Sequence, residues 1–161
     1  MPRILIIDDQ KDVRAMVAIV LRVNRYEVVE ADSGAAGVKA FSEAGFDAAI
    51  VDIFLGDTSG VEVIASLREL APNLPVVAVS GMTALDFMEQ SPHLANVVCL
   101  QKPFRPNDLL QALRKAQAVV DGDPRSSLIL TQEETPRASR GAMMIGGGLQ
   151  APASVLRCRC R

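Results

Sequence analysis

Short apolar runs alternate along the chain with segments of helical periodicity. Four runs, at residues 4–7, 48–51, 76–79 and 97–100, consist of aliphatic and other small apolar residues and end at polar or turn-forming residues. Runs of this length are typical of strands buried on both faces of a parallel sheet. A fifth run, at residues 26–30, mixes charged with apolar residues and therefore indicates an edge strand.

Helices are predicted between these runs, because apolar residues recur there at spacings of three and four and so share one helical face. The predicted stripes are Val13, Met16, Val17, Val20 and Leu21; Gly37, Ala40, Phe41 and Ala44; Val63, Ile64, Leu67 and Leu70; and Leu109, Leu113, Ala116 and Val120. A further short helix is predicted over residues 84–90. Alternating strands and helices predict an α/β fold, a parallel sheet with right-handed crossovers and helices on both faces.

The composition changes near residue 121. Hydrophobic residues make up 49% of the 161-residue chain, which is enough to form a core. Beyond residue 121 the chain is rich in Pro, Ser, Thr and Gly and has no sustained periodicity. We therefore predict one folded domain over residues 1–121 and a disordered tail over residues 122–161.

Charge and composition also narrow the range of partners. A net charge of -2 gives no general attraction to nucleic acid or to an anionic membrane, and the absence of Trp disfavours base stacking. No apolar stretch approaches the roughly 20 residues needed to span a bilayer. The three cysteines do not form a disulfide framework. We therefore expect a cytoplasmic protein that binds neither nucleic acid nor a membrane.

Polar side chains follow the four buried runs. Asp8 and Asp9 follow the first run, Asp52 the second and Ser80 the third, and Lys102 comes shortly after the fourth. Each has a simpler interpretation by itself, since Asp and Ser also begin helices and turns. Because the carboxyl ends of parallel strands share one edge of a sheet, however, all five are expected to meet in one crevice, and their joint occurrence favours a functional site.

Three neighbouring carboxylates repel one another unless a cation lies among them. Ligands that are all oxygen favour a hard ion such as Mg²⁺. We expect Asp9 and Asp52 to bind Mg²⁺ directly and Asp8 to bind it through a water. The backbone carbonyl of Phe54 would complete the ligands that the protein supplies.

A carboxylate beside Mg²⁺ can also act as a nucleophile and form an acyl phosphate. Asp52 alone follows the middle strand, so we predict that it accepts the phosphoryl group. The Lys102 ammonium and the Ser80 hydroxyl would then contact phosphoryl oxygens.

This pattern resembles the receiver (CheY-like) domain of bacterial two-component response regulators, from residue 3 to about residue 120. The resemblance rests on Ile6-Ile7-Asp8-Asp9, Val51-Asp52, Gly60, Val79-Ser80-Gly81 and Lys102-Pro103-Phe104. It implies a doubly wound, flavodoxin-like sheet of five parallel strands in the order 2-1-3-4-5.

The resemblance also implies a function, that of a single-domain response regulator in phosphorelay signal transduction. A histidine kinase or histidine phosphotransfer protein would transfer a phosphoryl group to Asp52 in a reaction that depends on Mg²⁺. The phosphoprotein would signal by protein–protein contact with an unidentified target. Apart from assisting its own phosphorylation and dephosphorylation, it would not be an enzyme.

Several positions depart from the family pattern. Cys99 occupies the position of the aromatic switch residue, so the usual switching description is in doubt. Gly56 stands where a Pro is common, and we expect a looser turn there. Phe54 and Met82 are apolar and cannot orient an attacking water, so we expect slow self-dephosphorylation.

Two alternative functions remain open. One is a pseudo-receiver that binds partners without being phosphorylated; Cys99 keeps it open, whereas the complete acidic set and Lys102 argue against it. The other is a hydrolase with an aspartyl-phosphate intermediate. Such enzymes need a second Asp two residues after the nucleophile of the first strand, and Gln10 occupies that position after Asp8.

Overall fold

The computed structural model describes residues 1–81, 86 and 96–122. Their strands and helices, in chain order, are β1 (Arg3–Ile7), α1 (Lys11–Val23), β2 (Glu27–Ala31), α2 (Gly34–Glu43), β3 (Ala48–Asp52), α3 (Gly60–Leu70), β4 (Val76–Ser80), β5 (Val97–Gln101) and α5 (Pro106–Val120). The helix expected over residues 84–90 lies outside the described residues except for Asp86. The tail expected over residues 122–161 lies outside them from residue 123 onward.

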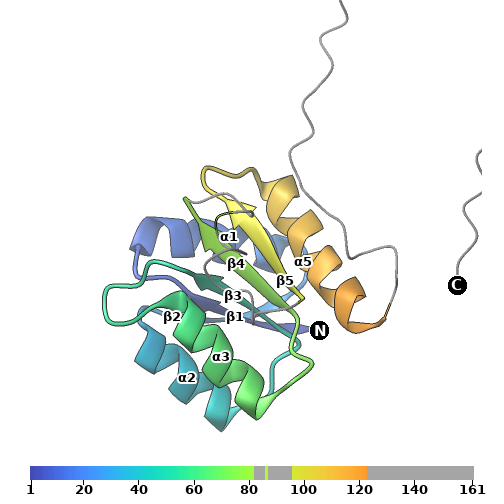
Figure 1. Ribbon diagram of the computed structural model, residues 1–161. Coiled ribbons are helices and arrows are strands. Elements are labelled where there is room, and N and C mark those ends of the chain that lie inside the picture. The colour runs from blue at the N-terminus through green and yellow to red at the C-terminus, as the bar shows by residue number, and fades with distance from the viewer. Residues whose placement is uncertain (82–85, 87–95, 123–161) are drawn as a thin grey trace, which may run out of the picture. The chain divides into compact units, whose positions relative to one another are not determined.

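The five strands form one parallel sheet in the order β2-β1-β3-β4-β5 (Figure 1). This order confirms the predicted α/β fold and the strand order implied by the family resemblance. In the register of the sheet, Ile7 of β1 lies opposite Val51 of β3, and Asp52 lies opposite Val79 of β4. The carboxyl ends of β1, β3 and β4 therefore lie level with one another.

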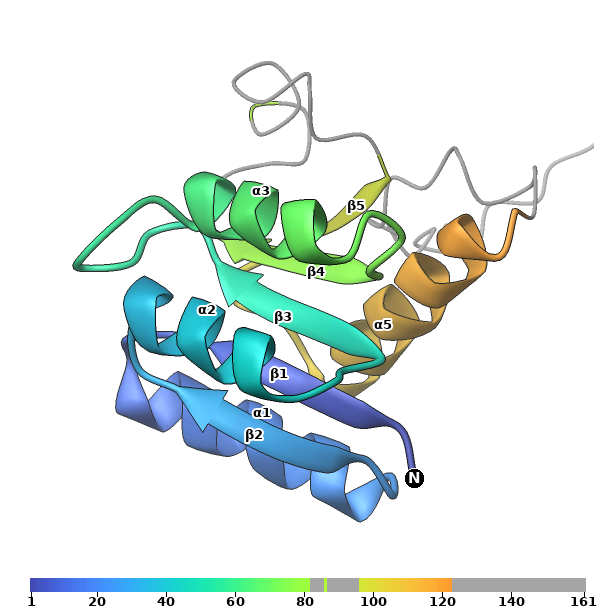
Figure 2. The same cartoon turned by 90° about the horizontal axis from the view of Figure 1, so that it is seen from below.

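Helices cover both faces of the sheet, α2 and α3 one face and α1 and α5 the other (Figure 2). Successive side chains of a strand point to opposite faces. Accordingly, Ile4 and Ile6 of β1 pack with α1 and α5, whereas Leu5 and Ile7 pack with the α2 and α3 side. Burial on both faces explains why the inner strands are continuous apolar runs.

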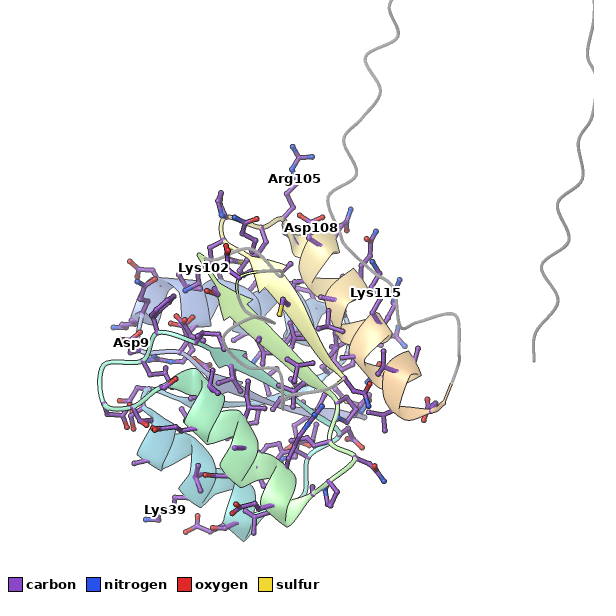
Figure 3. All side chains as sticks on the ribbon, viewed as in Figure 1. Asp9, Lys39, Lys102, Arg105, Asp108 and Lys115 are labelled. Carbon is purple, nitrogen blue, oxygen red and sulfur yellow. The ribbon has the colours of Figure 1, made fainter. Side chains whose placement is uncertain are left out.

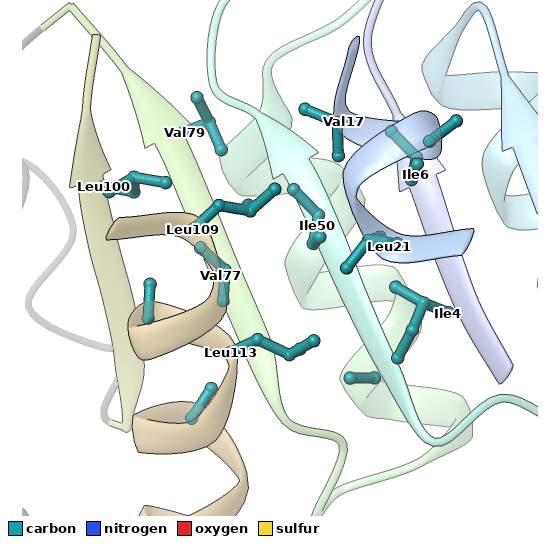
Figure 4. Packing of buried hydrophobic residues seen from close by; sticks show 14 residues of the cluster. Ile4, Ile6, Val17, Leu21, Ile50, Val77, Val79, Leu100, Leu109 and Leu113 are labelled. Carbon is teal, nitrogen blue, oxygen red and sulfur yellow. The ribbon is translucent and has the colours of Figure 1, made fainter. Parts of the chain in front are cut away.

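Figure 4 shows the core on the side of α1 and α5. Leu109 and Leu113 of α5 lie over the strands, where the same cluster includes Ile50 of β3 and Val77 of β4. Leu21 of α1 fills the adjoining part of the cluster. These side chains are the apolar stripes that the helical spacing predicted.

Two glycines allow helices to approach the sheet closely. A Cβ at Gly37 of α2 would overlap the side chain of Ile7, so a small residue is required there, as the stripe predicted. Gly60, the first residue of α3, lies against the backbone of Asp52 and Ile53. Any side chain at Gly60 would therefore push α3 away from the end of β3.

Two details of the predicted burial are wrong. Only Leu100 of β5 is buried, and the other four residues of that strand are half-buried. The reason is that β5 is an edge strand, which among the described residues pairs with β4 alone. Leu70 is 56% exposed because it is the last residue of α3, beyond the part of the helix whose side chains pack on the sheet.

Candidate functional site

Three carboxylates meet at the carboxyl end of the sheet. Oxygens of Asp8, Asp9 and Asp52 all lie within 4.8 Å of one another. Asp8 and Asp52 are each only 4% exposed, whereas Asp9 is exposed. The Nζ atom of Lys102 lies 2.7 Å from Oδ2 of Asp52 and 3.6 Å from Oδ2 of Asp8. Figure 3 shows Asp9 and Lys102 toward the same end of the molecule, far from Lys39.

The end of β1 holds Asp8 by both its backbone and its side chain. The Asp8 N–H donates to the carbonyl of Ala31 at 3.1 Å and so continues the β1–β2 pairing by one residue. Oδ1 of Asp8 accepts a hydrogen bond from the backbone N–H of Gln10 at 2.8 Å. Gln10 is the residue that caps α1, so neither aspartate serves as the N-cap itself. Asp9 is thereby placed at the open edge of the cluster.

Asp52 is the last residue of β3, and both of its carboxylate oxygens have partners. Oδ1 accepts a hydrogen bond from the backbone N–H of Phe54 at 2.9 Å, and Oδ2 accepts one from Nζ of Lys102 at 2.7 Å. The Ile53 N–H donates to the carbonyl of Val79 at 3.0 Å, so pairing with β4 continues past the aspartate. Phe54, whose backbone N–H holds Asp52, is itself 60% exposed.

The ends of β4 and β5 complete the site. Ser80 is the last residue of β4 and is buried. Its carbonyl accepts a hydrogen bond from the backbone N–H of Lys102 at 2.7 Å, and the Lys102-Pro103 peptide bond is cis. The hydrogen bond to the Ser80 carbonyl holds Lys102 just past β5, where its side chain reaches across β4 to Asp52 on the central strand.

The electrostatics of the cluster favour a cation. Burial raises the pKa of Asp8, and the charges of Asp52 and Asp9 raise it further, whereas the Gln10 N–H and Lys102 lower it. With all three carboxylates ionised, Lys102 balances only one of the negative charges. A divalent ion would neutralise the remainder, and three carboxylate oxygens are a suitable donor set for Mg²⁺.

The surroundings of Cys99 disfavour its thiolate form. It is half-buried on β5, opposite Ala78, and burial raises its pKa to about 11. It therefore remains protonated at neutral pH. Met82, the other apolar residue expected near the site, lies outside the described residues.

Two residues of the site's surroundings were missed from the sequence. Nη1 of Arg14 donates to the carbonyl of Asp8 at 2.6 Å, and Nε of Arg14 lies 3.6 Å from a Glu30 carboxylate oxygen. Asp57 accepts hydrogen bonds from the first residues of α2, so the loop beside Gly56 is tied to a helix. The looser turn expected at Gly56 stays a prediction. The only signal for Asp57 was its place in a loop, which favours turns but does not reveal a distant partner.

Comparison with known proteins agrees with this geometry. Residues 4–114 match the response regulator receiver domain. The chain belongs to this family. Receiver domains are the signalling modules of two-component systems, and the acidic cluster fits phosphorylation and Mg²⁺ binding. Neither the pseudo-receiver nor the hydrolase alternative is favoured. No helix among the described residues is long and apolar enough to cross a membrane.

Among its relatives, the chain is 28% identical over 115 residues to the response regulator receiver protein CpdR of Brucella abortus, covering 71% of the chain and 96% of CpdR. It is 29% identical over 117 residues to the chemotaxis protein CheY of Listeria monocytogenes, covering 72% and 98%. With the transcriptional regulatory protein KdpE of Mycobacterium tuberculosis the identity is 32% over 116 residues, covering 72% of the chain but 51% of KdpE.

Two solved structures are similar to this receiver. The chemotaxis protein CheY4 of Vibrio cholerae superposes with a TM-score of 0.68 at 26% identity, covering 72% of this chain and 98% of CheY4. The response regulator TrrA of Thermotoga maritima, solved in complex with Mg²⁺ and BeF, gives a TM-score of 0.65 at 25% identity, covering 72% and 99%.

Proposed function

We propose that this protein is a single-domain response regulator that accepts a phosphoryl group on Asp52 from a histidine kinase or a histidine phosphotransfer protein. One observation carries the proposal: a buried aspartate at the end of the central strand lies 2.7 Å from a lysine ammonium and beside two further carboxylates. A buried ion pair needs only one carboxylate and does not account for the other two. Phosphoryl transfer with Mg²⁺ would use all three carboxylates.

In the proposed transfer, a carboxylate oxygen of Asp52 attacks the phosphorus of the donor's phosphohistidine. The new O–P bond forms as the N–P bond breaks, and the histidine nitrogen leaves with the bonding electrons. Oδ1 of Asp52 is held by the Phe54 N–H, which orients the carboxylate. Lys102 moves from the carboxylate to a phosphoryl oxygen, and the Ser80 hydroxyl, at the end of the neighbouring strand, donates to another.

Bound Mg²⁺ would neutralise charge on the phosphoryl oxygens as the transfer proceeds. Asp9 and Asp52 would bind the ion directly, Asp8 through a water, and the Phe54 carbonyl would supply a backbone ligand. The exposure of Asp9 supports this assignment, because an ion at the open edge keeps several of its waters. TrrA, which is 25% identical to this chain, was solved in complex with Mg²⁺ and BeF, and this similarity supports Mg²⁺ binding here.

The phosphorylated receiver would act through contact with a separate protein target in the cytoplasm. Its chemistry is limited to assisting its own phosphorylation and dephosphorylation, so we do not class it as an enzyme. We propose no nucleic-acid or membrane partner, because the chain carries a net charge of -2. KdpE is a transcriptional regulatory protein, but the similarity covers only 51% of it. We therefore do not carry a role in transcription over to this chain.

The proposal is tested by incubation with acetyl phosphate in Mg²⁺ or in EDTA, followed by intact-mass and tandem mass spectrometry. We expect one added phosphoryl group on Asp52, in Mg²⁺ alone. Asp52→Ala should remain unlabelled and Lys102→Ala should label far more slowly. Asp32→Asn is the matched control, because Asp32 follows β2 at the same end of the sheet but is outside the acidic cluster.

Label on another residue, or none, would refute the assignment of Asp52. Equal labelling in EDTA would refute the role of Mg²⁺. The histidine donor is tested separately with a panel of autophosphorylated histidine kinases and phosphotransfer proteins. Radiolabel should leave the donor histidine and appear on wild-type protein, and the same transfer to Asp52→Ala would contradict the proposal.

A further inference from the structure

The loop between β3 and α3 is tied to a helix that precedes it by some 20 residues in the chain. Oδ1 of Asp57 accepts a hydrogen bond from the Gly34 N–H at 3.0 Å, and Oδ2 accepts one from the Ala35 N–H at 3.1 Å. Both oxygens of one side chain are thus engaged by two successive N–H groups. These hydrogen bonds lower the pKa of Asp57, so the carboxylate is ionised at neutral pH and both bonds are charge-assisted.

Asp57 serves α2 as an acceptor supplied by another part of the chain. The first N–H groups of a helix lack partners within the helix. At α2, the hydroxyl of the local cap Ser33 accepts from the Ala36 N–H at 3.1 Å, and Asp57 accepts from the two preceding N–H groups. The charge of Asp57 also lies at the positive end of the helix dipole. The loop and the start of α2 lie at the same end of the sheet (Figure 2).

Packing reinforces this tether. A Cβ at Gly34 would lie 2.8 Å from Cγ2 of Val63 in α3 and would overlap Thr58 of the loop. The start of α2 therefore fits closely against both the loop and the first turn of α3. Thr58 is itself held, because its hydroxyl donates to a carboxylate oxygen of Glu62 at 2.6 Å. These contacts hold the far end of the loop beside the start of α2 and the first turn of α3.

The other end of the same loop borders the acidic cluster. Phe54 donates its N–H to Asp52, and a Cβ at Gly56 would lie 3.4 Å from Oδ2 of Asp9. Gly56 immediately precedes Asp57 in the chain. The loop backbone therefore passes Asp9 and Asp52, the two expected direct Mg²⁺ ligands. At the next residue, Asp57, it is anchored to α2.

We propose that Asp57 is a positioning residue, which by binding the N-terminus of α2 holds the backbone of Phe54 and Gly56 in place beside Asp9 and Asp52 for Mg²⁺ binding. The inference rests on the proposed function. Loss of the tether raises the Mg²⁺ concentration that half-saturates phosphorylation, because the loop must be ordered when the ion binds. The rate at saturating Mg²⁺ changes little, because Asp52 and Lys102 are intact.

The coupling is reciprocal, because linkage requires that two sites stabilise each other equally. If an ordered loop favours Mg²⁺, then bound Mg²⁺ favours the ordered loop and its bonds to α2. Amide hydrogen exchange at Gly34 and Ala35 should therefore slow when Mg²⁺ is added to wild-type protein. A purely structural cap would give the same exchange rate with and without the ion.

The test compares Asp57→Ala with Ser33→Ala over a Mg²⁺ titration, with acetyl phosphate as the donor. Both variants remove an acceptor from the first turn of α2, but only Asp57→Ala releases the loop. We expect the half-saturating Mg²⁺ concentration to rise severalfold in Asp57→Ala and to change less than twofold in Ser33→Ala. Asp57→Asn keeps one oxygen acceptor without the charge and should give an intermediate value.

Equal shifts in the two alanine variants would show that only helix stability matters and would overturn the inference, as would no shift in Asp57→Ala. A lower rate at saturating Mg²⁺ in Asp57→Ala, with the half-saturating concentration unchanged, would also overturn it. If wild-type protein takes up no label, the proposed function fails instead. Isothermal titration of the same variants with Mg²⁺ alone then decides whether the tether affects ion binding.

Discussion

The apolar cores on the two faces of the sheet and two carboxylates of the acidic cluster, Asp8 and Asp52, are buried, but burial affects stability in opposite directions in the two regions. Ile7 and Asp8 are neighbours in the chain and illustrate the difference. Ile7 is fully buried among apolar side chains beneath α2, and Asp8 is 4% exposed among other carboxylates. Burial therefore has opposite effects at these adjacent residues: it stabilises the fold at Ile7 and destabilises it at Asp8.

The magnitudes of the two effects explain how the protein tolerates the site. Burying an aliphatic side chain contributes roughly 1.5–3 kcal/mol, and both faces of the sheet are lined with such residues. Burying a carboxylate destabilises the fold unless it is paired, and one lysine serves both Asp8 and Asp52. Burial of apolar side chains in the cores therefore offsets the cost of burying carboxylates at the carboxyl end of the sheet.

The largest expected effect tests the contribution of the cores. Leu21 of α1 is fully buried, so Leu21→Ala should lower the free energy of unfolding by about 2–5 kcal/mol through lost burial and a cavity. Ile19 is on the same helix but is 60% exposed, and Ile19→Ala should change stability by less than about 0.5 kcal/mol. Urea denaturation followed by circular dichroism measures both. Similar losses in the two variants would contradict the assignment of stability to the core.

Much of this contrast could be predicted from the sequence, because it is local. Apolar runs and helical spacing depend on neighbouring residues, and they predicted every strand and helix that the structure describes in full. The convergence of Asp8, Asp52 and Lys102 followed from the geometry of parallel strands, in which all carboxyl ends lie at one edge. The order of the strands came from the family resemblance and not from the spacing.

What could not be predicted depends on how separate elements face each other. Asp57 and Gly34 are distant in the chain, and no period links a loop carboxylate to a particular helix N-terminus. The contact of Arg14 with the Asp8 carbonyl likewise needs the angle at which α1 leaves β1. The half-burial of β5 follows from its place at the edge of the sheet, which its apolar run does not reveal.

The second prediction is that a bound cation offsets the cost of burying carboxylates at the carboxyl end of the sheet. A ligand that binds only the folded state stabilises it by about 2.7 kcal/mol at one hundred times its Kd. Under the proposed function, Mg²⁺ at that level should raise the free energy of unfolding of wild-type protein by this amount. Asp9→Ala should lose most of the increase, whereas Asp32→Asn should keep it.

Urea denaturation in EDTA and at increasing Mg²⁺ concentrations measures this effect. The midpoint of wild-type unfolding should rise with the logarithm of Mg²⁺ concentration once the site is occupied. Na⁺ at matched ionic strength is the control for general screening of the carboxylates. An equal rise with Na⁺ would show that the cluster needs only diffuse counterions and does not form a specific ion site.

The smallest effect concerns the charge of Asp8 in protein freed of metal by EDTA. Asp8→Asn keeps the shape of the side chain and an oxygen that can accept from the Gln10 N–H. It removes a charge that burial disfavours, so the free energy of unfolding at pH 7 should rise by about 0.5–2 kcal/mol. A variant less stable than wild type would show that the ion pair with Lys102 outweighs the burial of Asp8.

The pH dependence separates this charge effect from a change in packing. Burial raises the folded-state pKa of Asp8 above its ordinary value of 3.8, so the folded state binds the proton more tightly than the unfolded state does. The destabilisation by Asp8 is therefore complete above the raised pKa and disappears as the pH falls toward 3.8. The advantage of Asp8→Asn over wild type should shrink over the same range.

Asp57, whose pKa is lowered, acts in the opposite direction but equally in both proteins, so it cancels in their difference. An advantage that stays constant from neutral to acidic pH would mean that Asn packs better, and that the charge of Asp8 carries no penalty.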